Sequence, residues 1–172
     1  MNRSLLIVGA GTYGMLAYEI AVDMDCFGRI CFVDDNAKRT ENGIDVIGTT
    51  ADIKTLAAEY SDIVVAIGRP DVRLSVIERI KSETALNIAT LISPRAYVSP
   101  SAVIHGGCVI EPMAVVHTGC VIQQGCLICA GAVINHKSTC EEGVHVDCNA
   151  TVTGYATVPK GTKIKCNELY GA

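Results

Sequence analysis

The chain has 172 residues, of which 49% are hydrophobic and 19% are charged, and its formal net charge is -4. This composition predicts a folded protein of one ordinary domain or two small ones, and it excludes a disordered chain. The negative charge argues against a surface built for nucleic acid or anionic membrane, and no run of about 18 apolar residues exists to span a bilayer.

Cysteine usage bears on the cellular compartment and on metal binding. The nine cysteines are an odd number, and the apolar run from Leu5 to Val8 is too short for an export signal. We therefore expect a soluble cytoplasmic protein without a disulfide framework. Cys126 and Cys129 have the C-x-x-C spacing of a metal site, but the repeat described below gives most cysteines a role as small buried residues.

The first half of the chain alternates short apolar strands with amphipathic helices. The expected strands cover residues 4–9, 29–35, 62–68 and 86–92, and the expected helices cover residues 13–24, 50–60 and 71–83. Alternation of this kind is typical of a small parallel sheet flanked by helices. The pattern predicts an α/β, Rossmann-like domain over residues 1–90.

The second half, residues 91–172, repeats with a period of six. From Ile92 to Ile164 each sixth position is aliphatic or cysteine, and the position four further along is almost always small. Helices and amphipathic strands cannot keep a period of six, whereas a solenoid can. Three units complete a triangular turn, with aliphatic side chains inside the prism and small residues at its corners. This pattern is the hexapeptide signature of a left-handed parallel β-helix.

A glycine-rich turn is the first motif that indicates chemistry. The stretch VGAGTYG spaces Gly9, Gly11 and Gly14 as G-x-G-x-x-G between a predicted strand and a helix. Such glycines let the chain turn tightly and bring backbone N–H groups close to a phosphate at the helix N-terminus. Asp34 and Asp35 end the second strand, the usual place for an acid that binds a ribose hydroxyl. We expect a nucleotide site here; glycines that merely pack helix on strand are the alternative.

The four histidines, His105, His117, His136 and His145, all lie in the repeat. Three histidines can bind zinc on this fold, but the spacing of His117 and His136 exceeds one turn of the coil by one position, and no third histidine completes the arrangement. We therefore predict no metal. His136 is a candidate general base, since a neutral imidazole can accept a proton near physiological pH and several acidic residues follow it in the chain.

With both halves in view, the chain resembles the sugar acetyltransferases of the sialic-acid and bacillosamine type, which belong to the left-handed β-helix, hexapeptide-repeat superfamily. VGAGTYG resembles their glycine-rich first turn, FVDD their acidic strand end, AIGRPDVR the segment after the next strand, and NHKSTCEEGVHVD their pair of histidines. The resemblance covers nearly the whole chain. It implies a nucleotide-sugar-binding domain followed by a β-helix that binds acetyl-CoA, in a homotrimer.

The resemblance also implies residue roles. His136 matches the general base, and His145 matches a histidine near the acetyl-CoA thioester, with Gly154 beside the same cofactor. The nucleotide-sugar site would be lined by Gly9, Gly11, Thr12, Asp34, Asp35, Gly68 and Arg73.

Three departures from the family pattern affect the prediction of catalysis. Lys137 follows His136 where relatives commonly have Asp or Glu; a lysine cannot accept the imidazole N–H, and its charge makes His136 a weaker base. Glu141 or Glu142 is the alternative partner for the ring. Tyr13 stands in the glycine-rich turn where many relatives have a histidine, and the repeat ends soon after Ile164 without the further coils that many relatives use around CoA.

Three functions are compatible with these residues. The first is transfer of an acetyl group from acetyl-CoA to an amine or hydroxyl of a nucleotide-linked sugar, with N-acetylation of a UDP-4-amino sugar as the first choice. The second is a catalytically weak, trimeric nucleotide-sugar-binding scaffold, which Lys137 and the short C-terminus favour. The third is a metal-dependent lyase or hydrase on the same solenoid.

Overall fold

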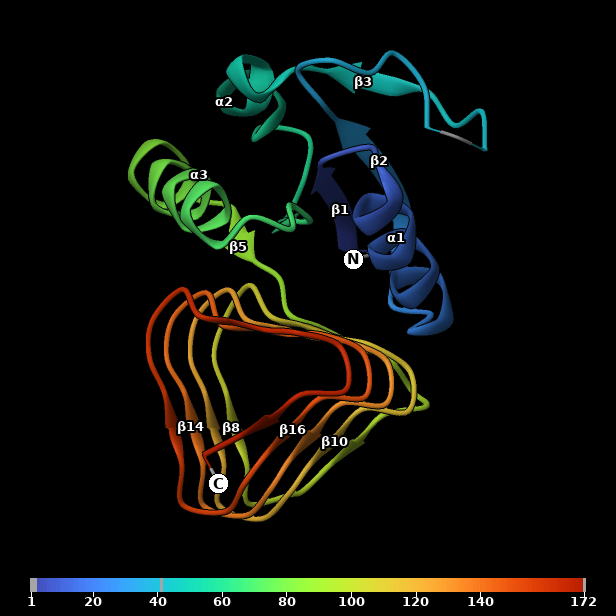
Figure 1. Ribbon diagram of the computed structural model, residues 1–172. Coiled ribbons are helices and arrows are strands. Elements are labelled where there is room, and N and C mark those ends of the chain that lie inside the picture. The colour runs from blue at the N-terminus through green and yellow to red at the C-terminus, as the bar shows by residue number, and fades with distance from the viewer. Residues whose placement is uncertain (1–2, 41, 172) are drawn as a thin grey trace. The chain divides into compact units, whose positions relative to one another are not determined.

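The computed structural model describes residues 3–40 and 42–171 (Figure 1). The chain divides into two compact units, Met1–Ala89 and Thr90–Ala172. Each unit has its own hydrophobic core. In the part of the chain that the structure describes, no helix has the length and hydropathy needed to cross a membrane.

The first unit is built on a five-stranded parallel sheet with the strand order β3-β2-β1-β4-β5. This is a Rossmann-like order, in which the crevice for a ligand lies at the carboxyl ends of the strands where the order reverses, here beside β1 and β4. The elements are β1 (Arg3–Val8), α1 (Thr12–Asp23), β2 (Phe27–Val33), β3 (Val46–Gly48), the 3-10 turn η1 (Thr50–Asp52), α2 (Ile53–Leu56), β4 (Asp62–Val65), α3 (Pro70–Glu83) and β5 (Asn87–Ile88).

The two central strands of this sheet are continuous apolar runs because both faces of the sheet are covered. Leu5, Leu6 and Ile7 of β1 are completely buried, as are Ile63 and Val64 of β4. Parallel sheets with helices on both faces show this pattern instead of an alternation of polar and apolar residues. The predicted α/β fold of the first half is therefore confirmed.

Two predicted elements of the first half differ in the structure. The helix expected over residues 50–60 is reduced to η1 and α2, because the backbone N–H groups of Ala58 and Glu59 bond to the carbonyls of Thr55 and Leu56 and tighten the last turn. The strand expected over residues 86–92 is divided into β5 and β6, which belong to different sheets.

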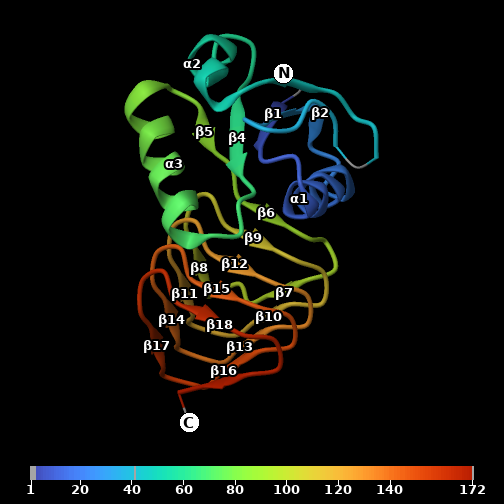
Figure 2. The same ribbon diagram turned by 45° about the horizontal axis from the view of Figure 1, so that its top comes forward.

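The second unit is a parallel β-helix of very short strands arranged in three sheets, each along one side of a triangular prism (Figures 1 and 2). Each strand pairs with the equivalent strands of the coils before and after it, as Val115 pairs with Tyr97 and Val133. The strands are β6 (Leu91–Ile92), β7 (Tyr97–Val98), β8 (Val103–Ile104), β9 (Val109–Ile110), β10 (Val115–Val116), β11 (Val121–Ile122), β12 (Leu127–Ile128), β13 (Val133–Ile134), β14 (Thr139–Cys140), β15 (His145–Val146), β16 (Thr151–Val152), β17 (Thr157–Val158), β18 (Lys163–Ile164) and β19 (Leu169–Tyr170).

The hexapeptide repeat corresponds to this architecture position by position. Every predicted inward position is the second residue of a strand, and those from Ile110 to Ile164 are at most 1% exposed. The small column fills the corners, with Cys120, Ala132 and Ser138 completely buried. The left-handed β-helix predicted for the second half is confirmed.

From residue 107 to residue 167, a third column of the repeat has a positive φ at each corner. It contains six glycines and five other residues, namely Gly107, Met113, Gly119, Gly125, Gly131, Lys137, Gly143, Asn149, Tyr155, Gly161 and Asn167. Side chains at positive φ are uncommon and carry a steric cost of about 1–2 kcal/mol each. Lys137 and Tyr155 are therefore corner residues in a conformation that glycine adopts more readily.

Candidate active site

The glycine-rich turn of the first unit is tightly packed at two of its three glycines. Gly9 has φ +103, and a Cβ there would lie 2.9 Å from the carbonyl oxygen of Ala66. A Cβ on Gly14 would overlap the carbonyl of Gly9, so α1 begins directly against the turn. Gly11 has open space beside it, which leaves the exposed start of α1 accessible to a ligand.

The two acids at the end of β2 are each engaged by backbone N–H groups. Asp34 accepts hydrogen bonds from the N–H groups of Ala10 at 2.8 Å, Asn36 at 2.8 Å and Ala37 at 2.9 Å. Burial opposes ionisation of Asp34, but these donors hold its pKa below the usual value. Asp35 accepts from the N–H of Thr50 at 2.7 Å and from its hydroxyl at 3.0 Å.

A cavity of about 300 Å³ lies at the carboxyl ends of the central strands. Its lining includes Gly9, Asp34, Asp35 and Ile67. A second hollow of about 320 Å³ adjoins it between β2 and β3 and shares both acids. The structure therefore brings these three predicted site residues together around one crevice, at the place that the strand order predicts.

The remaining predicted residues of this site lie outside the cavity lining. Thr12 is exposed at the first position of α1. Gly68 packs against the ring of Tyr13, since a Cβ at residue 68 would lie 3.0 Å from that ring. Arg73 is completely buried, and it donates to the carbonyls of Ile67 at 2.6 Å and Gly68 at 3.1 Å. Arg73 thus braces the loop between β4 and α3.

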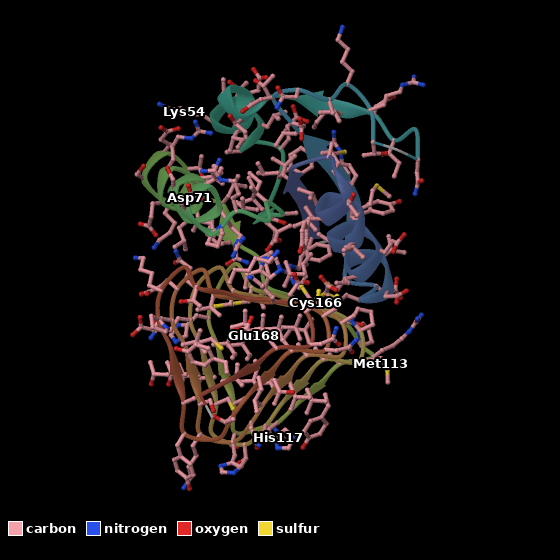
Figure 3. All side chains as sticks on the ribbon, viewed as in Figure 1. Lys54, Asp71, Met113, His117, Cys166 and Glu168 are labelled. Carbon is pink, nitrogen blue, oxygen red and sulfur yellow. The ribbon has the colours of Figure 1, made fainter. Side chains whose placement is uncertain are left out.

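His136 lies at the corner between the β13 face and the β14 face of the prism. Figure 3 labels His117 at this corner, after β10 of the same sheet. The half-buried imidazole packs against Gly154 of the next coil. A Cβ on Gly154 would be 2.8–3.2 Å from three of the ring atoms of His136. The ring of Tyr155 meets the imidazole edge to face at 5.1 Å, and the Tyr155 N–H donates to the His136 carbonyl at 3.1 Å.

Lys137 is turned toward Tyr155 of the next coil. Its φ is +57, its N–H donates to the Thr118 carbonyl at 2.9 Å, and its ammonium lies 5.4 Å from the centre of the Tyr155 ring. A cation over an aromatic face is attracted by the ring quadrupole. The lysine that replaces the usual acid therefore has a partner other than the imidazole.

The acids considered as partners for the His136 ring belong to the next corner of the prism. The carboxylate of Glu141 accepts the backbone N–H of Lys160 at 2.8 Å. Glu142 follows Glu141 beyond β14. Among the described residues, no side-chain hydrogen bond joins either carboxylate to His136, so the ring is oriented by Gly154 and Tyr155.

His145 lies on a different face of the prism from His136. It is the outward residue of β15, is completely buried, and places its Nε2 atom 3.4 Å from the Sγ atom of Cys129. Cys126 belongs to the core inside the prism, whereas Cys129 points outward, so the C-x-x-C spacing does not form a pair. A single chain therefore does not bring its two candidate active-site histidines to one place.

Sequence reasoning missed two contacts between side chains of neighbouring coils. Tyr155 lies one full turn of the coil after Lys137, and Asp147 lies one full turn after Cys129. Because equivalent positions of successive coils stack directly on one another, the repeat itself contains a signal for both pairs. The neighbours of any outward residue could have been read from the equivalent positions one turn before and one turn after it.

Comparisons with known proteins agree with this architecture. The PglD N-terminal domain family model matches residues 4–80. The acetyltransferase domain of PglB from Neisseria gonorrhoeae, solved in complex with acetyl coenzyme A, is 30% identical, with a TM-score of 0.87 over 97% of this chain and 90% of that one. A search of curated protein sequences gave no match.

Two more distant structures share the fold. PerB from Caulobacter crescentus, in complex with CoA and GDP-perosamine, is 17% identical, with a TM-score of 0.64 over 96% of this chain and 90% of that one. WeeI from Acinetobacter baumannii is 15% identical, with a TM-score of 0.60 over 97% and 88% of the two chains. The gonococcal domain matches both units along almost their full length, and the family model matches the first unit. The chain therefore belongs to the hexapeptide-repeat sugar acetyltransferases.

Proposed function

We propose that the protein transfers the acetyl group of acetyl-CoA to the amine of a nucleotide-linked sugar, with His136 as the general base. Residues 1–90 bind the nucleotide sugar, and residues 91–172 bind acetyl-CoA and carry the base. The acceptor that we propose first is a UDP-4-amino sugar. Transfer to a hydroxyl of a nucleotide-linked sugar is the alternative, and an assay of thiol release separates the two.

The observation that carries this proposal is the placement of the His136 ring. The imidazole lies on Gly154 and against Tyr155, is half-exposed, and makes no hydrogen bond through its ring nitrogens to any described residue. A ring that is held in place and keeps a nitrogen available can accept a proton from an incoming nucleophile.

The chemistry requires such a base. A sugar amine is protonated near neutral pH and must lose a proton before or during its attack on the thioester carbonyl. Once the ammonium has lost one proton to water, the nitrogen forms a bond to the acetyl carbon and the carbon–sulfur bond breaks. The second nitrogen proton passes to the imidazole, which transfers it to the sulfur, so that CoA leaves as the thiol. Backbone N–H groups along the coil can stabilise the oxyanion that develops on the way.

The first unit supports a nucleotide-sugar ligand. The cavity beside Gly9 and the acids of β2 lies next to the start of α1, where backbone N–H groups favour a phosphate. The carboxylates of Asp34 and Asp35 hold the surrounding loops through N–H donors, and each keeps lone pairs for a ribose hydroxyl or a base edge. Gly11 and Thr12 would contact the phosphates.

A homotrimer completes the active site in this proposal. His136 and His145 lie on separate faces of one prism, and a neighbouring subunit can bring the second face opposite the first. Large apolar side chains exposed on the β-helix support such packing; they are Tyr97, Val103, Met113, Tyr155 and Leu169. A solution mass equal to one chain at micromolar concentration would contradict a site shared between subunits.

The test is thiol release from acetyl-CoA with a panel of UDP- and GDP-linked amino sugars, each beside the matching sugar with a hydroxyl in place of the amine, for wild type, His136→Ala and His105→Ala. His105 is an exposed histidine after β8, at another corner, and serves as the matched control. We expect turnover that requires an amino sugar, falls at least about 100-fold in His136→Ala and persists in His105→Ala.

One observation favours a second function. Lys137 supplies a cation where the family commonly has an acid, and no described acid takes over contact with the ring. This arrangement fits a nucleotide-sugar-binding trimer with little catalysis. Absence of turnover with every acceptor, together with absence of CoA binding and retained UDP-sugar binding, would establish that function in place of the first.

A further inference from the structure

The third face of the prism carries polar side chains in two outward columns, one of which is apolar in its first three coils. The outward column of this face reads Leu91, Val109, Leu127, His145 and Lys163, one residue per coil. A second outward column, just beyond the strands, contains Glu111, Cys129 and Asp147, again one residue per coil. Figure 2 shows β12, β15 and β18 on successive coils of this face. The fold therefore collects an imidazole, a thiol and two carboxylates on neighbouring coils.

Three of these side chains converge. The Sγ atom of Cys129, a ring nitrogen of His145 and a carboxylate oxygen of Asp147 all lie within 4.8 Å of one another. The contact between Cys129 Sγ and His145 Nε2 is 3.4 Å. A tetrahedral zinc ion with Zn–S near 2.3 Å and Zn–N near 2.0 Å places those two ligand atoms about 3.5 Å apart. The observed pair already has the separation that a shared ion requires.

Most of this cluster is buried, which distinguishes it from a chance group of polar side chains on the surface. Cys129 is 1% exposed and His145 is completely buried, whereas the Asp147 side chain is 18% exposed. Two donors thus lie in a low-dielectric region, and the third opens toward solvent. Glu111 is also buried and accepts the N–H of Ala130 at 2.9 Å, which adds a negative charge next to Cys129.

We propose that Cys129, His145 and Asp147 form a zinc-binding site, with water as the fourth ligand. Thiolate, imidazole and carboxylate are all zinc ligands, and three protein ligands with one open position are typical of zinc sites that retain water. The two anionic ligands balance the charge of the ion. The thiol proton of Cys129 passes to solvent when the ion binds.

An ion pair of Asp147 must open for the ion to bind. The ammonium of Lys163 lies 3.1 Å from Asp147 Oδ2. The Lys163 side chain is 48% exposed, so it can move into water, and the zinc ion replaces it as the partner of the carboxylate. The backbone N–H of Cys148 continues to donate to the other oxygen of Asp147, at 2.9 Å, and keeps that carboxylate oriented.

Cobalt and zinc titrations of the full chain, stripped of metal with a chelator, test the proposal. We expect one equivalent of Co²⁺ to produce a thiolate-to-cobalt charge-transfer band in the near ultraviolet, and Zn²⁺ to displace it. In Cys129→Ser the band should disappear, and zinc affinity should fall more than about 100-fold, since even the loss of an outer-shell contact costs 10–100-fold.

Two further variants keep the test decisive if Cys129→Ser is poorly folded. Asp147→Asn changes the partly exposed ligand and should weaken zinc binding while the melting curve without metal stays cooperative. Cys31→Ser alters a half-buried thiol of the first unit and should leave the titration unchanged. A missing cobalt band in wild type would overturn the proposal. So would a band that survives Cys129→Ser and disappears in Cys166→Ser, because the exposed thiol would then be the ligand.

This site does not depend on the proposed acetyl transfer, since the titrations contain neither CoA nor sugar. If His145 also contacts acetyl-CoA, zinc will inhibit turnover in wild type and the inhibition will be lost in Cys129→Ser. Zinc binding without any turnover would support the metal site and contradict the transferase. Turnover without zinc binding would do the reverse.

Discussion

The α/β unit and the β-helix hold their candidate functional side chains in different ways. In the α/β unit, Asp34 and Asp35 are held by N–H donors from loops at the ends of adjacent strands. In the β-helix, His136 is held by Gly154 and Tyr155, one coil further along the chain. Positions in the first unit therefore depend on particular loops, whereas those in the second follow from the constant register between successive coils.

This difference predicts how far the structural effect of a substitution extends in each unit. A change inside the prism disturbs the stacking of coils and all corners that depend on it. A change in the glycine-rich turn disturbs one crevice and leaves the sheet intact. The substitutions below test this contrast, beginning with the largest expected effect.

Ile122→Ala removes a completely buried side chain from the centre of the prism. We expect the free energy of unfolding to fall by about 3–5 kcal/mol, because the substitution loses apolar contact and leaves a cavity between rigid coils. Thr157→Ala is the control, since Thr157 is exposed on the outside of the same sheet and should change stability by less than about 0.5 kcal/mol. Chemical denaturation measures both; equal effects would mean that the prism interior is not the stabilising core.

Gly154→Ala tests whether the coil that follows His136 positions its imidazole as the proposed base. The new Cβ would lie 2.8–3.2 Å from the His136 ring, so the imidazole must move, although the backbone of residue 154 tolerates alanine. Given His136 as the base, we expect kcat/KM to fall about 100-fold, or about 2.7 kcal/mol of transition-state stabilisation, with little change in the melting temperature. Unchanged turnover in Gly154→Ala would mean that catalysis does not depend on this position of the His136 ring.

The period of six explains how much of the β-helix could be predicted. The inward residues from Ile92 to Ile164, the small corners and the stacking of His136 over Gly154 all follow from one register. The same register places Tyr155 next to Lys137, but the direction of the Lys137 ammonium depends on side-chain rotamers at two left-handed corners, which the repeat does not encode. The meeting of Cys129 with His145 required the outward direction of Cys129, which the C-x-x-C spacing had obscured.

In the α/β unit, the sheet could be predicted from the sequence, whereas the details of its loops could not. Buried strands and the glycine-rich turn indicated the sheet and a ligand site near Asp34, where the structure has a cavity. The structural use of Arg73 as a brace and the early end of the helix predicted over residues 50–60 were missed. Both depend on carbonyl groups of loops, whose directions no periodic pattern encodes.

Gly9→Ala and Gly11→Ala form a matched pair within the glycine-rich turn. Gly9 has φ +103 and a carbonyl 2.9 Å from its missing Cβ, whereas Gly11 has no neighbouring atom within 4 Å. We expect Gly9→Ala to lower the free energy of unfolding by about 2 kcal/mol. Gly11→Ala should leave the melting temperature nearly unchanged and raise KM for the nucleotide sugar, because its methyl group occupies the open space at the start of α1. A normal KM in folded Gly11→Ala would place the phosphates elsewhere.

Asp62→Asn gives the smallest expected effect and tests the role of charge in the α/β unit. The buried carboxylate accepts two hydrogen bonds from Arg3, at 2.5 and 3.1 Å, and one from Asn87 at 2.6 Å. Burial raises the pKa of Asp62, but these donors outweigh it and hold the pKa below the usual value. At pH 7 we expect a loss of about 1.5 kcal/mol, as for a hydrogen bond to a charged group.

The pH dependence of this variant has a definite sign. Because the folded pKa of Asp62 lies below the unfolded value, its stabilisation is complete above about pH 4 and is lost as the pH falls through the folded pKa. The difference in melting temperature between wild type and Asp62→Asn should therefore be constant from pH 7 to about pH 5 and shrink in stronger acid. Asp71→Asn is the control, since its ion pair with Arg69 is exposed and should contribute little at any pH. A difference that persists unchanged in acid would mean that the shape of the Asp62 side chain, and not its charge, joins β1 to β4.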